Sequence, residues 1–317
     1  MIKSSNQLVT ERCNSRCEMC SVWKLRDKSY EMTPREFAEL YEHNEFRELE
    51  DLCISGGEPT LRKDLFEVVD EIRMRTPLLR MLFLSTNGTN PEKALDFMKR
   101  YSPHVQDIYV CPSLEGPREV HNEIRGVDCY DKVIETAEIV QKASLPNAHV
   151  VFSTTLQPEN CNEDSLNHIK GLAMEIGCTY SFRPASRNES FYHNLGNDSF
   201  LVGPKGIEFI KQYMERHKIS DPFLDILLAH LSGDTTFMGD REEGINCLAG
   251  KISVFIKPNG DIYPCINSTR IIGNREDGIT ERDYQLGDKE LCPCCTECQV
   301  YPMLNFGQHA HEGPENE

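Results

Sequence analysis

Three cysteines near the start of the chain, Cys13, Cys17 and Cys20, have the spacing Cys-x3-Cys-x2-Cys. They follow a first predicted strand and therefore lie on the loop at its carboxyl end. Three thiolates from one short loop can bind three irons of a cubane cluster, because such clusters are held by cysteine sulfur. A fourth cysteine at matching spacing is absent, which leaves one iron with an open coordination position, as in catalytic metal sites. A zinc loop is the alternative, although zinc sites usually use paired Cys-x2-Cys knuckles.

This triplet resembles the cysteine motif of the radical S-adenosylmethionine (radical SAM) enzymes, and three further motifs agree with that family. Each motif lies at the end of a successive predicted strand. They are the Gly-Gly-Glu-Pro run Gly56-Gly57-Glu58-Pro59, the segment Ser85-Thr86-Asn87-Gly88, and Ser113-Leu114-Glu115-Gly116-Pro117 with His121 and Arg125-Gly126. The resemblance is continuous over residues 5–185.

The resemblance implies a [4Fe–4S] cluster with S-adenosylmethionine (SAM) at its open iron. It implies that Glu58 and the neighbouring backbone contact the methionyl amino group, that Ser113 approaches the ribose, and that Arg125 approaches the carboxylate region. Two positions depart from the family pattern: Glu115 replaces the usual Asp, and Met19 replaces a frequent aromatic residue. The implied cofactor-binding set is Met19, Gly56, Gly57, Glu58, Pro59, Thr86, Asn87, Ser113 and Arg125.

A second cysteine group lies in the C-terminal part of the chain. Cys247 and Cys265 flank a predicted hairpin, and Cys295-x2-Cys298 adds a knuckle. Four thiolates can hold either zinc or an iron–sulfur cluster. The ending Gly260-x4-Cys265 resembles the SPASM and twitch domains of radical SAM enzymes, which carry auxiliary [4Fe–4S] clusters.

The truncated twitch form with one auxiliary cluster fits this sequence better than a full SPASM domain. Leu304 and Gln308 stand where a full SPASM domain continues with cysteines. Cys292 with Cys295 is an alternative knuckle to Cys295 with Cys298.

Three further residues are weak catalytic candidates. Cys111 and Cys129 lie toward the expected active-site end and could donate a hydrogen atom to a radical. Arg183 follows the last core strand, where a substrate would enter. Cys53, in contrast, falls within an apolar strand pattern and is expected to be a buried small hydrophobic residue.

These residues must be positioned by an alternation of strands and helices. Strands are predicted at residues 52–55, 80–85, 107–110, 149–155 and 179–183, in addition to a first strand before Cys13. Helices are predicted at 33–46, 62–75, 91–101, 130–143, 163–177, 204–217 and 221–232; the first opens with the capping box Thr33-Pro34-Arg35-Glu36. About six βα units predict an α/β fold, a partial (β/α)6 barrel of TIM type, with its chemistry at the carboxyl ends of the strands.

The pattern changes in the second half of the chain. Residues 251–256 and 261–263 flank Lys257-Pro258-Asn259-Gly260, which predicts a hairpin in a small twitch-like domain. We therefore expect a core barrel at 1–200, a helical linker at 201–244, the iron–sulfur domain at 245–306 and a disordered tail at 307–317.

Composition limits the partners and the compartment. A net charge of −17 disfavours nucleic-acid binding. No segment has the roughly 18 consecutive apolar residues of a membrane span. Fourteen cysteines without a secretory signal indicate a reducing, cytoplasmic compartment.

The resemblance implies an enzyme of oxidoreductase or epimerase type, reduced by a flavodoxin or ferredoxin. It would cleave SAM reductively to a 5′-deoxyadenosyl radical that abstracts hydrogen from a substrate C–H bond. About a dozen residues precede Cys13, which we take to favour a small molecule, such as a sugar or aminocyclitol, over a peptide. A peptide maturase is the alternative. A non-catalytic iron–sulfur or zinc protein for electron transfer or scaffolding is a third hypothesis, which the SAM-pocket motifs disfavour.

Overall fold

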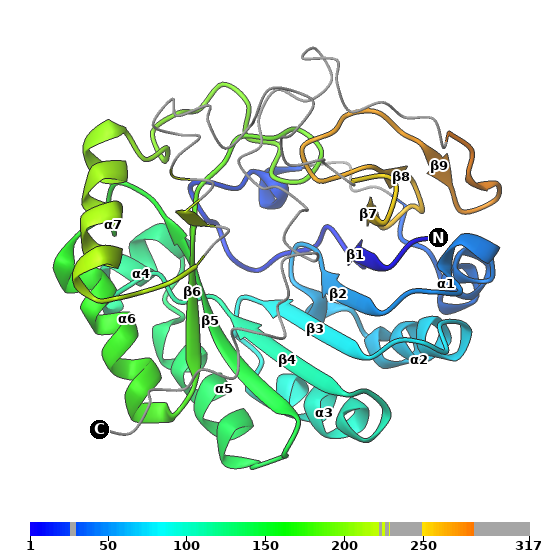
Figure 1. Ribbon diagram of the computed structural model, residues 1–317, viewed down its shortest axis with the longest axis horizontal. Helices are drawn as coiled ribbons and strands as arrows, with labels where there is room; N and C mark the ends of the chain where they lie inside the picture. The colour runs from blue at the N-terminus through cyan, green and yellow to red at the C-terminus, as the bar shows by residue number, and fades with distance from the viewer. Residues whose placement is uncertain (26–29, 222–223, 226–227, 229–248, 282–317) are drawn as a thin grey trace.

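A curved sheet of ten strands organises the molecule, in the order β10-β9-β8-β7-β1-β2-β3-β4-β5-β6 (Figure 1). This computed structural model describes residues 1–25, 30–221, 224–225, 228 and 249–281. From β1 to β6 neighbouring strands are parallel, and the sheet does not close on itself. The predicted α/β fold with a partial barrel is therefore confirmed.

The strands and helices have the following bounds. The strands are β1 (Ser4–Leu8), β2 (Asp51–Ser55), β3 (Met81–Thr86), β4 (Asp107–Pro112), β5 (Ala148–Leu156), β6 (Thr179–Pro184), β7 (Ser253–Ile256), β8 (Ile262–Tyr263), β9 (Gly273–Asn274) and β10 (Gly278–Ile279). The helices are α1 (Pro34–Tyr41), α2 (Leu65–Arg75), α3 (Pro91–Tyr101), α4 (Arg118–Arg125), α5 (Tyr130–Lys142), α6 (Glu163–Ile176) and α7 (Pro204–Arg216).

Local sequence signals explain where several helices begin and end. The capping box of α1 forms as predicted, because Thr33 and Glu36 each accept a hydrogen bond from the other's backbone N–H. The helix α6 begins at the cap Asn162 and ends at Gly177, which has a positive φ of 79°. Helix α4 is not among the helices expected from the sequence; it ends at Arg125, and Gly126 caps it in the left-handed conformation.

The C-terminal hairpin extends the sheet beyond β1. Strand β7 pairs with β1 in parallel, with Ser4 opposite Ser253, and β8 returns antiparallel to β7. The turn between them closes through hydrogen bonds from the N–H of Lys257 to Asp261 and from the N–H of Gly260 to Lys257. The predicted hairpin is thus confirmed, and it continues the edge of the sheet on which the first cysteine loop begins.

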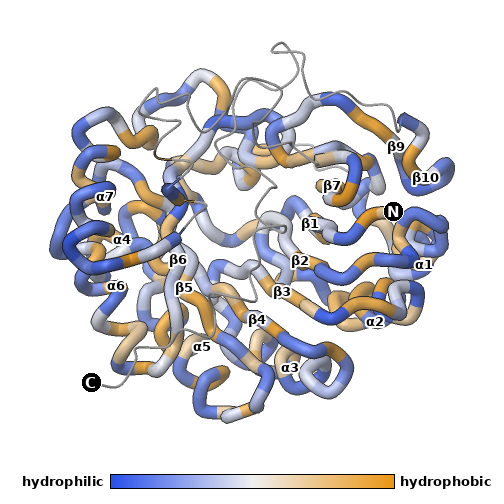
Figure 2. The backbone as a smooth tube through the Cα atoms, in the orientation of Figure 1, coloured by the Kyte–Doolittle hydropathy of each residue, from blue (hydrophilic) through white to orange (hydrophobic). Residues whose placement is uncertain are grey.

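The two faces of the sheet have different environments. Helices cover its outer face, and bands of hydrophobic and hydrophilic residues alternate along them (Figure 2). Buried residues such as Leu52, Leu82 and Ile108 form the main core between the sheet and these helices. None of the helices in the described ranges is long and apolar enough to cross a membrane. The concave face, by contrast, is left to line a cavity.

Candidate functional site

A cavity of about 410 Å³ occupies the concave face of the sheet. At the end called upper here, which is formed by the carboxyl ends of β2, β3 and β4, the cavity wall contains Cys13, Cys17 and Cys20. Its walls continue down to the first residues of the strands, including Ser4 of β1 and Asp51 of β2. The cavity therefore extends from the cysteine loop to the base of the barrel, the end at which the strands begin. Its volume lies within the range of ligand-binding pockets.

Main-chain hydrogen bonds hold the cysteine loop from both sides. On one side the N–H of Gly57 donates to the carbonyl of Thr10, and the N–H of Glu58 donates to the carbonyl of Arg12. Both N···O distances are 2.7 Å. On the other side the N–H of Arg16 donates to the carbonyl of Arg125 over 2.9 Å. The loop is thus fixed between the end of β2 and the end of α4.

Three glycines make this close approach possible. A Cβ atom at Gly56 would overlap the carbonyl oxygen of Thr10, one at Gly57 that of Arg12, and one at Gly126 that of Arg16. The absence of a Cβ atom at these positions therefore lets the cysteine loop pack directly against the neighbouring backbone.

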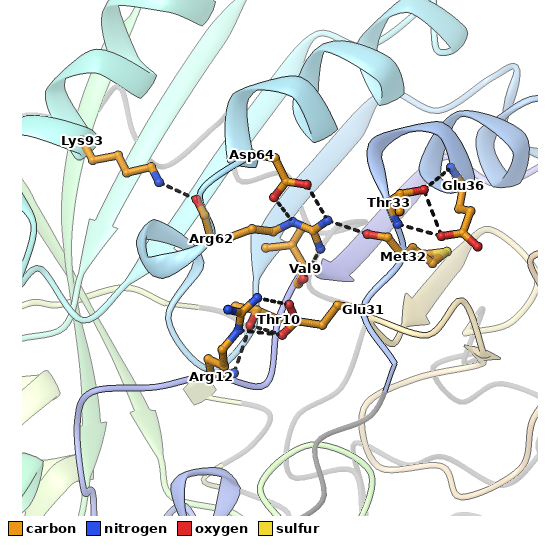
Figure 3. Close-up of polar contacts among 10 residues, drawn as sticks. All are labelled: Val9, Thr10, Arg12, Glu31, Met32, Thr33, Glu36, Arg62, Asp64 and Lys93. Carbon is orange, nitrogen blue, oxygen red and sulfur yellow. Dashed lines mark hydrogen bonds and ion pairs between the residues drawn. The ribbon is translucent and has the colours of Figure 1, made fainter.

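Buried side chains fix the segment that leads into the loop (Figure 3). Arg62, 3% exposed, donates to the carbonyls of Val9 and Met32 and pairs with Asp64 at 2.8 Å. Beside it the carboxylate of Glu31 accepts from Arg12 and from the hydroxyl of Thr10. The residues just before Cys13 therefore have little freedom to move.

The three thiols share one wall of the cavity but do not converge on a single point. In the described ranges no three His, Cys, Asp or Glu side chains come close enough to bind one metal ion. A cubane separates its ligands, because each cysteine binds a different iron. Burial raises the pKa of Cys13, Cys17 and Cys20, the last to about 12. Metal binding must therefore displace protons from these thiols.

Glu58 joins the ends of two strands. Its Oε1 accepts from the backbone N–H and hydroxyl of Thr60 and from the hydroxyl of Thr86, at 2.7–3.0 Å. Its Oε2 accepts from the N–H of Asn87 at 2.6 Å. Asn87 in turn donates to Asn14 and Ser15 of the cysteine loop. Glu58 is fully buried, so its carboxylate orders the ends of β2 and β3 against that loop.

Arg125 and Glu115 form a buried ion pair beside the thiols. Arg125 Nη1 lies 3.2 Å from Glu115 Oε1, and Glu115 Oε2 accepts from the N–H of Thr155 at 2.8 Å. Although burial opposes the charge of Arg125, the neighbouring Cys17 and Glu115 raise its pKa. Its Nε has no hydrogen-bond partner among the described residues. A buried donor without a partner is the kind of group that a bound anion or polar ligand satisfies.

The remaining weak candidates are divided by the structure. Cys111 and Arg183 line the cavity. Cys129 does not line it; its sulfur lies 3.3 Å from Nε2 of His121. His121 accepts at Nδ1 from the N–H of Glu115, and burial lowers its pKa to about 3, so Nε2 carries the hydrogen toward Cys129.

Most of the cofactor-binding set proposed from sequence surrounds the cavity. The cavity-lining members are Met19, Gly56, Gly57, Thr86, Asn87, Ser113 and Arg125. Glu58 and Pro59 do not line it. The wall at the base of the cavity is not expected from the sequence. There Cys53, expected to be a buried small hydrophobic residue, lines the same cavity as Asp51 and Tyr109. The alternation of side chains along β2 and β4 could have predicted this wall, because residues two apart in a strand lie on the same face of the sheet.

The second cysteine group lies almost entirely outside the described residues. Cys265, which is buried and 8% exposed, follows β8. Cys247, Cys292, Cys295 and Cys298 lie outside the described ranges, as does the tail at 307–317.

Comparison with known proteins places this site in a family. Residues 8–170 match the profile of the radical SAM superfamily. The chain is 26% identical to the mycofactocin maturase MftC of Mycolicibacterium smegmatis, over 94% of this chain and 76% of that protein. The family implies a [4Fe–4S] cluster and SAM, and the cavity wall offers three thiols and an unpaired Arg125 Nε for them.

Solved structures share the fold. SuiB of Streptococcus suis, bound to the precursor peptide SuiA, superposes with a TM-score of 0.65 at 14% identity. That match covers 90% of this chain, which spans 65% of the SuiB chain. The enzyme anSMEcpe with bound AdoMet superposes with a TM-score of 0.63 at 19% identity, over 94% of this chain and 87% of that one.

These findings overturn the expectation that a small molecule is favoured over a peptide. MftC, similar over nearly the whole chain, is a maturase, and SuiB holds a precursor peptide. The expectation failed because the number of residues before Cys13 does not determine what a cavity between the sheet and its loops admits. The match over residues 8–170 settles the family itself. The chain belongs to the radical SAM superfamily.

Proposed function

We propose that this radical SAM enzyme is a peptide maturase that abstracts hydrogen from a C–H bond of a peptide. One observation carries the proposal: the cysteine loop, the ends of three strands and Arg125 surround one end of a cavity that extends to the base of the barrel. Similarity to MftC over 94% of the chain supports the maturase class. The fold shared with the SuiB–SuiA complex is consistent with a peptide in such a cavity.

Cys13, Cys17 and Cys20 are proposed as the ligands of the [4Fe–4S] cluster. When bound, the cluster and SAM together supply the 5′-deoxyadenosyl radical that removes the hydrogen atom. The protein's own task is to hold both groups still and to exclude water. The main-chain bonds from Gly57, Glu58 and Arg16 contribute to the first part, because they hold the loop that carries the three cysteines.

SAM is proposed to lie against the cavity-lining members of the set predicted from sequence. Gly56, Gly57, Thr86 and Asn87 line the same cavity as the three cysteines. Arg125 has an unpartnered Nε, which suits a carboxylate. Glu58 is proposed to act indirectly, because both of its oxygens already accept hydrogen bonds from the ends of β2 and β3.

Anaerobic reconstitution tests this assignment. Reduced with dithionite, the wild type should cleave SAM to 5′-deoxyadenosine, measured by chromatography. Cys13→Ala, Cys17→Ala and Cys20→Ala should each abolish cleavage while circular dichroism stays unchanged, because none of the three cysteines belongs to the main hydrophobic core. Cys178→Ala, which lies outside the cavity, should keep full cleavage. Cleavage by any of the three variants would contradict the ligand assignment.

Substrate class is tested by coupled turnover. Synthetic peptides should accelerate SAM cleavage, and a matched set of sugars and aminocyclitols should not. Mass spectrometry of the product separates the two reaction types: oxidation removes two hydrogen atoms, whereas epimerisation leaves the mass unchanged. Acceleration by the sugars alone would contradict the peptide proposal while leaving the radical SAM assignment intact.

One auxiliary [4Fe–4S] cluster of the twitch type is proposed, with Cys247, Cys265, Cys295 and Cys298 as ligands and Cys292 as the alternative to Cys298. Supporting this, Cys265 is buried and lies two residues after the end of β8. Two cubanes predict about eight irons per chain, whereas a zinc site predicts about four irons and one zinc. Metal analysis of anaerobically purified protein decides between them. A cytoplasmic location is also proposed, on the abundance of cysteine in the sequence.

A further inference from the structure

Three polar side chains at the base of the cavity have oxygens without hydrogen-bond partners. Among the described residues nothing bonds to Asn6 Oδ1, Asp51 Oδ1 or the Tyr109 hydroxyl. All three residues line the cavity, and Tyr109 and Asp51 are only 1% and 9% exposed. Buried polar groups are nearly always hydrogen-bonded, because an unmet bond is costly. Three such groups in one cavity therefore indicate a ligand.

Strand register brings these groups to one region. Asn6 pairs with Cys53, Cys53 with Phe83, and Phe83 with Tyr109, so Asn6 and Tyr109 lie on the same level of the sheet. Asp51 precedes Cys53 by two residues, so it shares the concave face one level below. It is close enough that its charge acts on the Tyr109 hydroxyl.

The wall around this region is rigid. The ring of Tyr109 stacks between Phe83 and His149, with ring centroids 4.5 Å and 4.6 Å apart. His149 Nε2 in turn lies 2.9 Å from Asp107. Tyr109 is thus held in place by packing, and its hydroxyl is available to a ligand without rearrangement.

The charges at the base favour a cation. Arg80 is the cation that acts on Asp51, and its Nε pairs with Glu50 at 3.1 Å on the surface. The carboxylate of Asp107 has His149 as its partner. The base therefore offers a carboxylate, an amide oxygen and a hydroxyl as acceptors. A hydroxyl group of a ligand can donate only one hydrogen bond. An ammonium or guanidinium group can donate several, and it also neutralises the charge of the buried Asp51 carboxylate.

We propose that this base is a subsite for a basic side chain, lysine or arginine, of the peptide substrate. The cationic group pairs with Asp51 and donates to Tyr109 and Asn6. Asp51 lies four residues from Ser55 at the other end of β2, about 13 Å at the rise of a strand. When the side chain of a substrate residue binds at Asp51, the backbone of that residue lies nearer to the cysteine loop. This inference rests on the proposed peptide function, whose substrate class it narrows.

Binding of two matched probes to the SAM-loaded holoenzyme tests the subsite. N-acetyl-lysinamide carries the ammonium, and N-acetylnorleucinamide has the same stem without it. Dissociation constants from ligand-observed NMR titration should favour the lysine probe by at least about tenfold in the wild type. Asp51→Asn should reduce that preference to below about twofold, and Tyr109→Phe should reduce it in part. Asp131→Asn removes a surface carboxylate of α5 that pairs with Arg118 outside the cavity, so this control should keep the preference.

Two results would overturn the subsite: equal affinity of the wild type for both probes, or a preference that survives Asp51→Asn. The wild-type comparison needs no variant, so it stands even where a substitution impairs folding. Acceleration of SAM cleavage by synthetic peptides is measured in parallel with the same wild-type preparation. Absent acceleration counts against the proposed peptide function, whereas peptide-accelerated cleavage without a cation preference counts against the subsite alone.

Discussion

The two ends of the cavity differ in how completely their polar groups are satisfied. At the upper end Glu58 accepts four hydrogen bonds, and main-chain bonds hold the cysteine loop from two sides. At the base Asn6, Asp51 and Tyr109 each leave an oxygen unpaired. The hydrogen bonds at the upper end therefore order the loop and strand ends proposed to hold the cofactors. The unpaired oxygens at the base suit the proposed side chain of a substrate, which binds and is released in each turnover.

Arg125 links the two situations. It pairs with Glu115 on one side and keeps a buried side-chain donor, Nε, without a partner among the described residues on the other. Three changes test the contrast between the ends: removal of the Arg125 side chain, addition of a methyl group where the cysteine loop packs on Gly57, and removal of the charge of Asp51.

The largest effect is expected for Arg125→Ala. Glu115 is fully buried, and loss of its partner leaves an uncompensated charge, which typically costs about 3–5 kcal/mol of unfolding free energy. SAM affinity should fall by about tenfold to a hundredfold with the lost charged contact. Chemical denaturation of the SAM-free protein and calorimetric SAM titration measure the two effects.

A control comes from the same helix. Arg118 lies on the surface of α4 and pairs with Asp131 in solvent, so Arg118→Ala should leave stability and SAM affinity nearly unchanged. The double variant Arg125→Met with Glu115→Gln should recover much of the lost stability, because it removes both charges. Equal losses for Arg118→Ala and Arg125→Ala would mean that the buried pair has no special role.

Crowding the loop contact should have the next largest effect. In Gly57→Ala the new methyl group overlaps the carbonyl of Arg12, and overpacking of this kind costs about 1–3 kcal/mol. Because the contact holds the cysteine loop, iron content after reconstitution should fall as well. Gly171→Ala is the matched control: its Cβ meets nothing within 4 Å inside α6, so it should stabilise by about 0.5–1 kcal/mol. Full iron loading of Gly57→Ala would show that the loop does not need the close approach.

How much of this could be read from sequence differs between the same two ends. Hydrophobic strand patterns located β2 to β6, and the spacing of Cys13, Cys17 and Cys20 located the loop. Local signals suffice there, because each motif is contiguous and lies at a strand end. The role of Gly126 against Arg16 could not be predicted, because it depends on how α4 packs on a loop more than 100 residues earlier.

The base of the cavity could not be predicted for a related reason. Asp51, Asn6 and Tyr109 belong to three strands, and each by itself resembles an ordinary polar residue in a strand. Their common face follows from the register of the curved sheet. The absence of partners is a property of the folded cavity and has no counterpart in the one-dimensional pattern.

The smallest of the three main effects, and the one that tests the base directly, is a gain in stability from Asp51→Asn. Burial raises the pKa of Asp51 to about 6 in the folded chain, above its ordinary value of 3.8. The folded state therefore binds more protons than the unfolded state between about pH 4 and 6, so the carboxylate destabilises the fold increasingly as pH rises through this range. The asparagine amide carries no charge but also lacks partners, which offsets part of the gain. At pH 7.5 the SAM-free variant should be more stable by about 1–2 kcal/mol, and near pH 4 the difference should vanish. Urea denaturation at both pH values measures it. A gain that is the same at pH 4 and pH 7.5 would not come from the carboxylate, and the contrast between the two ends of the cavity would lose its electrostatic basis.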